Sequence, residues 1–260
     1  MLPTIVGVPG MWHPASSFDD LAANFQKRGY TFVSQDAPGI LLEDSFTATA
    51  EVDAESLRQN LPLPLLAQGR HLILLTHSYG GVYGSAAVSG LSKQERSRQG
   101  LEGGVIGLVY VTAVPPVTGK SLMDILGLAL DSLPPHVVYE KSTARVLFVN
   151  PDKHMYHGIT DADIDKWISK IRPQAFKSID TPISYSPLTD SDYKDQVAYI
   201  ICGKDRILSL DAQKLLCELV GITETVVLPE ASHHAFFVEA AEETVEATIS
   251  FLERFVRKVL

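Results

Sequence analysis

The feature that most constrains this chain is the stretch Leu72–Val88, which reads LILLTHSYGGVYGSAAV. Its apolar start is typical of a buried strand, and its small residues are typical of a helix packed tightly against that strand. Between the two, Ser78 falls at a sharp turn, and Gly80 and Gly81 leave the room that a strand needs where it meets a helix. We interpret this stretch as a nucleophile elbow of the Gly-x-Ser-x-Gly type, with Thr76 in place of the first glycine.

A simpler interpretation is that Ser78 caps the helix that follows it. The elbow interpretation requires two further residues that a helix-capping serine would not require. An acid and then a histidine must follow the serine in the chain, each after a later strand of the same sheet.

Both residues are present in that order. Asp205 follows the apolar run Val197–Gly203, and the pair His233 and His234 follows the run Thr225–Glu230. A neutral imidazole can take the proton of the serine, and the carboxylate can hold the imidazole in the correct tautomer. We favour His233 as the base because it occupies the loop position of the motif. Asp205 also has two structural alternatives, a turn carboxylate or an ion pair with its neighbour Arg206.

Attack on a carbonyl also requires hydrogen-bond donors for the oxyanion. The residue after the nucleophile, Tyr79, supplies one backbone N–H, and the loop after the first strand usually supplies the other. That loop contains Pro9 and Gly10, which turn the chain, followed by Met11, whose N–H we expect to be the second donor. An ordinary Pro-Gly turn is the alternative.

Strand and helix patterns alternate on both sides of a central stretch that lacks this rhythm. Strands that are apolar throughout, with helices between them, predict a parallel sheet covered on both faces. We therefore expect an α/β fold whose core comprises residues 1–114 and 195–260. Residues 115–194 are rich in proline but also in large apolar residues, which predicts an inserted helical cap rather than a linker.

Composition excludes several classes of function. The 260 residues carry a formal net charge of −9, which disfavours binding to nucleic acid. No apolar run approaches the ~20 residues of a membrane span, and the first residues do not read as a signal peptide, so we expect a cytoplasmic protein. The two cysteines have no zinc-ligand partners at a suitable spacing, and we expect neither a metal nor an organic cofactor.

Four motifs together resemble the small α/β-hydrolases related to plant methyl esterases and hydroxynitrile lyases, and more closely their microbial relatives. These motifs read PGMWH, THSYGG, CGKDRI and SHHAFF, and the resemblance covers nearly the whole chain. It implies a catalytic triad of Ser78, Asp205 and His233, with Met11 and Tyr79 as oxyanion donors. Met11 replaces the usual alanine, and it keeps the backbone donor. Enzymes of this family are often dimers, so a homodimer is a further expectation.

Several other side chains are candidates for the substrate pocket. Those that we expect to line it are Trp12, His13, Leu122, Met123 and Met155. Lys120 precedes a predicted cap helix, and in hydroxynitrile lyases a cap-side lysine assists the lyase chemistry. His154 and His157 resemble a metal pair, but no carboxylate at helical spacing joins them, and exposed cap histidines are the simpler interpretation.

These observations predict a serine hydrolase that cleaves a small, largely hydrophobic carboxylic ester, lactone or thioester through an acyl-enzyme on Ser78. Two alternatives stay open, because a fold and a triad do not dictate a reaction. One is a lyase or cyclase that uses the same triad on a small molecule. The other is a hydrolase-like protein that binds a small ligand without turning it over.

Overall fold

The computed structural model describes residues 2–41, 45–157, 159, 161–234 and 240–259. Its centre is a six-stranded parallel sheet in the order β2-β1-β3-β4-β8-β9. The strands are β1 (Thr4–Val8), β2 (Phe32–Ser34), β3 (His71–His77), β4 (Gly104–Val111), β8 (Val197–Cys202) and β9 (Thr225–Leu228). The sheet and its flanking helices confirm the predicted α/β-hydrolase fold.

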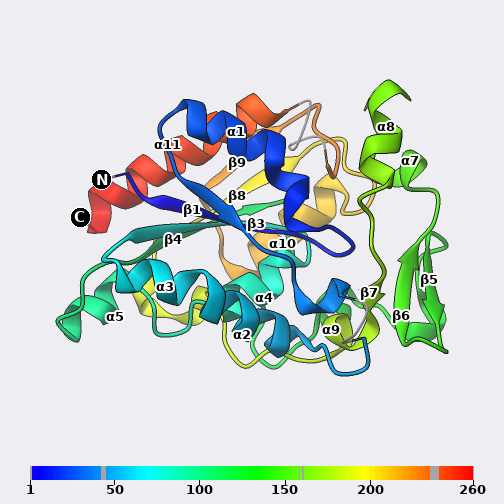
Figure 1. Ribbon diagram of the computed structural model, residues 1–260, viewed down its shortest axis with the longest axis horizontal. Coiled ribbons are helices and arrows are strands. Elements are labelled where there is room, and N and C mark those ends of the chain that lie inside the picture. The colour runs from blue at the N-terminus through cyan, green and yellow to red at the C-terminus, as the bar shows by residue number, and fades with distance from the viewer. Residues whose placement is uncertain (1, 42–44, 158, 160, 235–239, 260) are drawn as a thin grey trace.

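Burial along the strands explains why the sheet has helices on both faces. All eight residues of β4 are buried, as are six of the seven in β3, whereas the edge strand β9 is largely accessible. Central strands without a polar face must be covered on both sides. Figure 1 shows α1 (Asp19–Lys27) and α11 (Ala241–Val259) on one face of the sheet.

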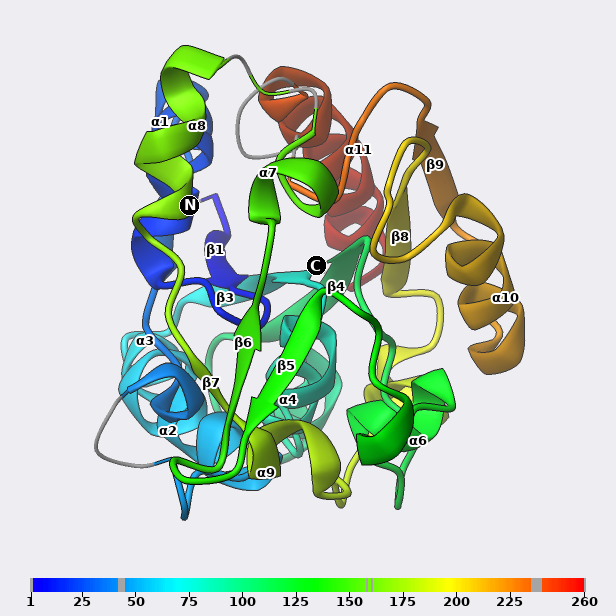
Figure 2. The ribbon, with the colours of Figure 1, turned by 90° about the vertical axis from the view of Figure 1, so that its right-hand side faces the viewer.

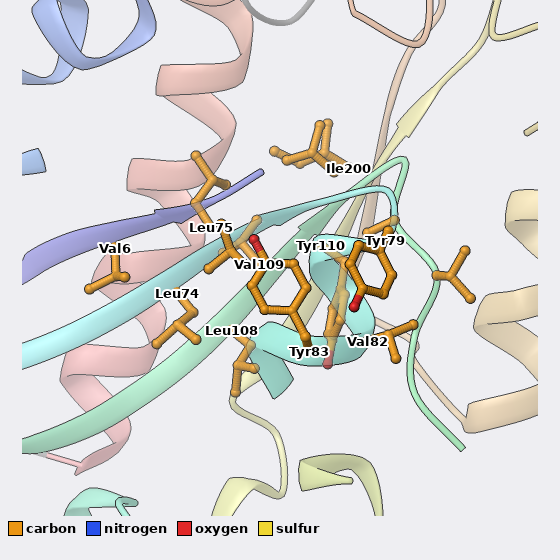
Figure 3. Packing of buried hydrophobic residues seen from close by; sticks show 14 of the residues in the cluster. Val6, Leu74, Leu75, Tyr79, Val82, Tyr83, Leu108, Val109, Tyr110 and Ile200 are labelled. Carbon is orange, nitrogen blue, oxygen red and sulfur yellow. The ribbon is translucent and has the colours of Figure 1, made fainter. Parts of the chain in front are cut away.

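The opposite face is covered by helices from the middle of the first half of the chain (Figure 1). They are α2 (Ala50–Asn60), α3 (Pro62–Ala67) and α4 (Gly80–Ala86), while α5 (Lys93–Arg98) follows near the start of β4 and α10 (Leu210–Val220) connects β8 to β9. The sequence predicts that this helical stretch is interrupted at Pro62 and at Pro64. The break between α2 and α3 falls at Pro62, whereas α3 continues through Pro64. Figure 3 shows Tyr79 and Tyr83 of the α4 region packed beside Tyr110 of β4 in the core.

The segment between β4 and β8 lies over the carboxyl ends of the strands, as Figures 1 and 2 show from two directions. The expected short helices are present, and the segment also contains a three-stranded antiparallel sheet that the sequence analysis did not anticipate. Its elements are α6 (Leu122–Leu126), β5 (Val137–Glu140), β6 (Arg145–Phe148), α7 (Pro151–His154), α8 (Asp161–Ile168), β7 (Gln174–Ala175) and α9 (Phe176–Asp180).

Helix α6 begins where local hydrogen bonding fixes its first turn. The Ser121 hydroxyl accepts from the Asp124 N–H at 3.1 Å, and the Asp124 carboxylate accepts from the Ser121 N–H at 2.9 Å. This capping box satisfies two donors that a helix start would otherwise leave unpaired. Gly127 ends the helix in the left-handed conformation, with a φ of 63°.

The last helix, α11, occupies most of the predicted span 235–260, and its first predicted residues, 235–239, lie outside the described residues. Among the described helices, none combines the length and the apolar character that crossing a membrane requires.

Candidate active site

Ser78 lies at the turn between β3 and α4, at the carboxyl edge of the sheet. Its φ is +51°, a left-handed conformation that non-glycine residues rarely adopt. Strain of this kind persists where the surrounding structure fixes it, and it clusters at functional sites. Here the surrounding structure is the close contact between α4 and the neighbouring loops.

Steric fit at the two glycines after Ser78 shows why the sequence is restricted here. A Cβ on Gly80 would lie 2.3 Å from the carbonyl oxygen of Val8, and one on Gly81 would lie 2.5 Å from the carbonyl oxygen of Val114. Both obstacles are backbone atoms that cannot rotate away. The elbow therefore requires glycine at both positions.

Thr76, the departure from the usual motif, is accommodated by a third glycine. The Thr76 side chain is buried, and a Cβ on Gly84 would lie 3.2 Å from its γ-methyl carbon and 2.9 Å from a methyl of Val8. The absence of a side chain at Gly84, one turn into α4, leaves the space that the threonine methyl occupies.

Asp205 and His233 meet at the same edge of the sheet. The Asp205 Oδ2 lies 2.5 Å from the His233 Nδ1, and both side chains are buried. The bond to the carboxylate places a proton on Nδ1, so Nε2 is the nitrogen that can accept a proton from a substrate-side hydroxyl. His233 and Ser78 line the same cavity.

The remaining contacts of Asp205 keep it ionised. Burial alone raises the pKa of a carboxyl group, but the His233 ring and hydrogen bonds from Thr112 and the Leu208 N–H outweigh it, and the pKa of Asp205 is lowered. Its Oδ1 accepts from the N–H groups of Ile207 at 2.7 Å and Leu208 at 2.8 Å. The alternative partner, Arg206, instead donates to the Lys153 carbonyl at 3.0 Å.

The two histidines of the last loop have different surroundings. His234 is buried among other rings, 4.1 Å from His13 and 4.8 Å from His77 between centroids. Burial and the neighbouring imidazoles lower the pKa of His234 well below its ordinary value. His77 donates from Nε2 to the carbonyl of His233 at 3.1 Å, which ties the last loop to the elbow.

The predicted oxyanion donors also lie at this edge. Met11 lines the cavity, and Tyr79 directly follows Ser78 at the start of α4. Among the hydrogen bonds between described residues, neither the Met11 nor the Tyr79 N–H has an acceptor. Two unpartnered N–H groups beside a serine hydroxyl are the arrangement that a developing oxyanion needs.

Side chains hold the peptide unit between Met11 and Trp12 at its carbonyl and at its N–H. On one side, His13 Nδ1 lies 2.7 Å from the Met11 carbonyl oxygen, and its Nε2 lies 2.6 Å from the Tyr156 hydroxyl. Because a carbonyl can only accept, Nδ1 carries the proton and Nε2 accepts from Tyr156. Burial lowers the pKa of His13 to about 4, consistent with this neutral ring.

On the other side, the Trp12 N–H donates to Gln174 Oε1 at 3.2 Å. Trp12 itself has a φ of +64°, and its ring donates to the Val146 carbonyl at 3.0 Å. Sequence reasoning missed Gln174 and Tyr156, and no local pattern marks either one. Their partners are more than 140 positions away in the chain.

The cavity at Ser78 has a volume of about 280 Å³ and is almost entirely apolar. Its polar contributors besides Ser78 and His233 are few, and the clearest is the ring of His136, which stacks on His154 at 4.6 Å. The other side chains that line it come from both the core and the cap: Met11, Trp12, Val114, Leu122, Met123, Leu126, Leu128, Leu133, Pro134, Val137, Phe148, Ile179, Ile207, Leu208 and Ala212.

Three of the predicted pocket residues lie on this lining and two do not. Trp12, Leu122 and Met123 line the cavity. His13 lies behind the oxyanion turn, and Met155 is buried in the cap away from the lining. Hydrogen bonding turns His13 toward Met11 and Tyr156 rather than toward the cavity.

A second, larger hollow of about 500 Å³ lies near the amino end of β8. It is lined by residues such as Asp190, Lys194 and Glu224, and its lining includes none of Ser78, Asp205 and His233. Ligands of open α/β sheets bind outside the carboxyl ends of the strands, so we place the site at Ser78.

Within the described residues, one group of side chains has ligand atoms close enough to hold a metal. It comprises His77, His233 and His234, whose ring nitrogens lie within 4.8 Å of one another. All three rings already have structural partners, since His77 bonds to a carbonyl, His233 to Asp205 and His234 to the backbone of Met155. The cap histidines form no such group, because His154 stacks on His136 and His157 binds the Lys204 carbonyl at 2.7 Å.

Comparison with known proteins agrees with this fold. Residues 5–247 match the family model described as "Alpha/beta hydrolase family", and the chain belongs to that family. A fungal relative, the alpha/beta hydrolase nvfD of Aspergillus novofumigatus, is 24% identical over 206 residues, which is 78% of each chain.

Two solved plant structures share the fold over nearly the whole chain. Tomato methylketone synthase I in complex with 2-tridecanone has a TM-score of 0.77, with 16% identity over 98% of this chain and 99% of its own. The methylesterase protein MES16 from Arabidopsis has a TM-score of 0.68, with 20% identity over 96% of this chain and 100% of its own. Both structures share the α/β-hydrolase fold of this chain.

Proposed function

We propose that this protein is a serine hydrolase that cleaves a small, largely hydrophobic carboxylic ester, lactone or thioester. One observation carries the proposal. A serine in a strained elbow and a histidine backed by a buried carboxylate line a single apolar cavity, beside two backbone N–H groups that have no acceptor among the described residues.

The reaction follows from these groups in two half-reactions. Ser78 Oγ attacks the carbonyl carbon while His233 Nε2 takes its proton, and the Met11 and Tyr79 N–H groups bind the oxyanion. The tetrahedral species collapses, the bond to the leaving alcohol breaks, and His233 returns the proton to that alcohol. Water then gives a proton to His233 and attacks the acyl carbon; the bond to Ser78 Oγ breaks, His233 returns the proton to Oγ, and the acid is released.

The cavity supports a substrate with an apolar body. Its lining offers leucine, methionine and aromatic side chains, and the described lining includes no lysine, arginine or carboxylate. A charged substrate body would lose its hydration there without gaining a partner. Aromatic or aliphatic esters of modest size are therefore the first compounds to test.

The decisive experiment is an ester and lactone panel run on the wild type beside Ser78→Ala and His233→Ala. Both variants should unfold at nearly the wild-type temperature and lose about 10³-fold or more in kcat/KM. Labelling with a fluorophosphonate should modify the wild type and fail with Ser78→Ala. A variant that keeps full activity would remove its residue from the mechanism.

The same experiment separates the two alternatives. A lyase reacts with the probe but hydrolyses no ester, and a non-catalytic binding protein turns over nothing in the panel. Lys120, the cap lysine that would favour lyase chemistry, has an exposed side chain and lies outside the cavity lining. We therefore rank hydrolysis first.

A further inference from the structure

The side chain of Tyr79 points away from the cavity and into the core. Tyr79 is 1% exposed, and its hydroxyl donates to the Asp53 Oδ2 at 2.7 Å. Asp53 is a fully buried residue of α2, and its Oδ1 accepts from the Gly39 N–H at 2.7 Å. Thus the residue whose N–H is the proposed oxyanion donor is anchored through its ring to a buried carboxylate.

From Tyr79 the polar contacts continue into the cap. The Tyr79 hydroxyl lies beside Ser178 of α9, whose Oγ donates to the Ala175 carbonyl at 2.7 Å and accepts from Gln174 Nε2 at 2.6 Å. Gln174 Oε1 in turn accepts from the Trp12 N–H. The four linked side chains are Asp53, Tyr79, Ser178 and Gln174, and we refer to them as the Asp53 network.

Close packing at Gly39 shows that this network has no spare room. A Cβ there would lie 2.4 Å from Gln174 Nε2, 2.8 Å from Asp53 Oδ2 and 3.2 Å from Ser178 Oγ. The backbone of Gly39 therefore packs directly on three of the four members. Close packing of this kind restricts the motion of the groups attached to it.

We propose that the Asp53 network is a positioning device that fixes both oxyanion donors at once. One end holds the ring of Tyr79, whose own N–H is the first donor. The other end holds the Trp12 N–H, which belongs to the peptide unit directly after the second donor, Met11. Asp53 is a positioning residue because it touches no reacting atom. This inference rests on the proposed function, since it assigns a role to the donors of that reaction.

The charge on Asp53 gives the network a distinct signature. Within the described residues no cation pairs with this carboxylate, and the titratable groups that face it are Tyr79 and Tyr83, both from the α4 region. Burial raises the pKa of Asp53 to about 6, against hydrogen bonds from Tyr79 and Gly39 that lower it. Protonation adds a donor to a carboxyl group whose partners, the Tyr79 hydroxyl and the Gly39 N–H, are both donors, and it weakens the charge-assisted bond to Tyr79.

The test compares Asp53→Asn with Glu55→Gln, which makes the same acid-to-amide change on an exposed residue of the same helix. Against a chromogenic ester, Asp53→Asn should lose about tenfold in kcat with KM little changed, the loss expected for one weakened charged hydrogen bond. The wild-type kcat should also change in a step near pH 6, where Asp53 titrates, and Asp53→Asn should lack this step while Glu55→Gln keeps it.

A second variant guards against a misfolded Asp53→Asn. Gln174→Met breaks the network at its other end, and it should lower kcat and slow labelling by the fluorophosphonate by a similar factor. If both variants keep the wild-type kcat and pH profile and only unfold more easily, the network is structural and the inference is wrong. A wild type that neither reacts with the probe nor hydrolyses any ester overturns the proposed function, and the positioning role with it.

Discussion

The two halves of the candidate site, the proposed nucleophile elbow and the proposed oxyanion turn, are built in opposite ways. The elbow at Ser78 is fixed by its immediate neighbours in the chain, because glycines let α4 approach backbone carbonyls that no side chain could pass. The turn at Met11 and Trp12 is fixed by side chains from the cap. Gln174 binds the Trp12 N–H directly, and Tyr156 acts on the Met11 carbonyl through His13. A glycine packed against a backbone carbonyl tolerates no larger side chain, whereas a hydrogen bond from a residue distant in the chain can be weakened or lost by one substitution.

The sharpest way to break the elbow is Gly80→Ala. The new methyl would meet the Val8 carbonyl oxygen at 2.3 Å, and neither group can rotate away. We expect the free energy of unfolding to fall by at least about 3 kcal/mol, with esterase activity lost even in the folded fraction. Denaturant unfolding and a chromogenic ester assay measure the two effects. An active variant of wild-type stability would show that the elbow is not sterically fixed.

Measuring the free energy of unfolding at a series of pH values isolates the contribution of Asp53, the carboxylate that binds the Tyr79 hydroxyl. The pKa of Asp53 is about 6 in the folded protein against 3.8 as its ordinary value. Between these values the unfolded chain has released the proton that the folded protein still holds, so stability from this group falls as pH rises from about 4 to 6. The pKa difference corresponds to an upper limit on the order of 3 kcal/mol.

The measurement compares the unfolding free energy of the wild type and of Asp53→Asn between pH 4.5 and 8. The variant lacks this titrating group. Its free energy of unfolding relative to that of the wild type should therefore rise up to about pH 6 and stay constant above that pH. Asp205 contributes in the opposite sense, because its lowered pKa costs stability as pH falls, but it is common to both proteins. A difference that stays flat with pH would show that Asp53 is not perturbed.

The smallest effect is expected at the oxyanion turn, from Tyr156→Phe. The change removes the hydroxyl that bonds to His13 Nε2 and leaves the ring in place. We expect a loss of about 1 kcal/mol in stability, the usual value of one buried hydrogen bond. The kcat should fall severalfold because the Met11 carbonyl is less firmly held. Unchanged kinetics with lowered stability would mean that His13 keeps the turn in place without Tyr156.

Much of the first half of this comparison was predictable from sequence. The elbow is contiguous, so its strand, serine and glycines appear together in one stretch, and strand ends bring Asp205 and His233 to the same edge of the sheet. The fold followed from apolar strands alternating with helices. In each case the information is local or is set by the regular geometry of a parallel sheet.

The second half could not be predicted, because its information is spread over the chain. Gln174 lies on β7, a strand of two residues with no periodicity to reveal it, and Tyr156 lies in an irregular part of the cap. Asp53 offered one clue, since it shares a helical face with the apolar residues Ala50 and Leu57. A carboxylate on a buried face indicates a polar partner, but only the folded structure identifies that partner as Tyr79.

The attachment of the oxyanion turn to the cap has a consequence for changing what this protein accepts. The segment over the strand ends forms much of the pocket wall. The same segment carries Gln174, Ser178 and Tyr156, so a transplanted lid would remove the supports of the turn at Met11 and Trp12 along with the old wall. If the proposed function holds, selectivity and turnover are inherited together, and a successful graft must keep those three side chains.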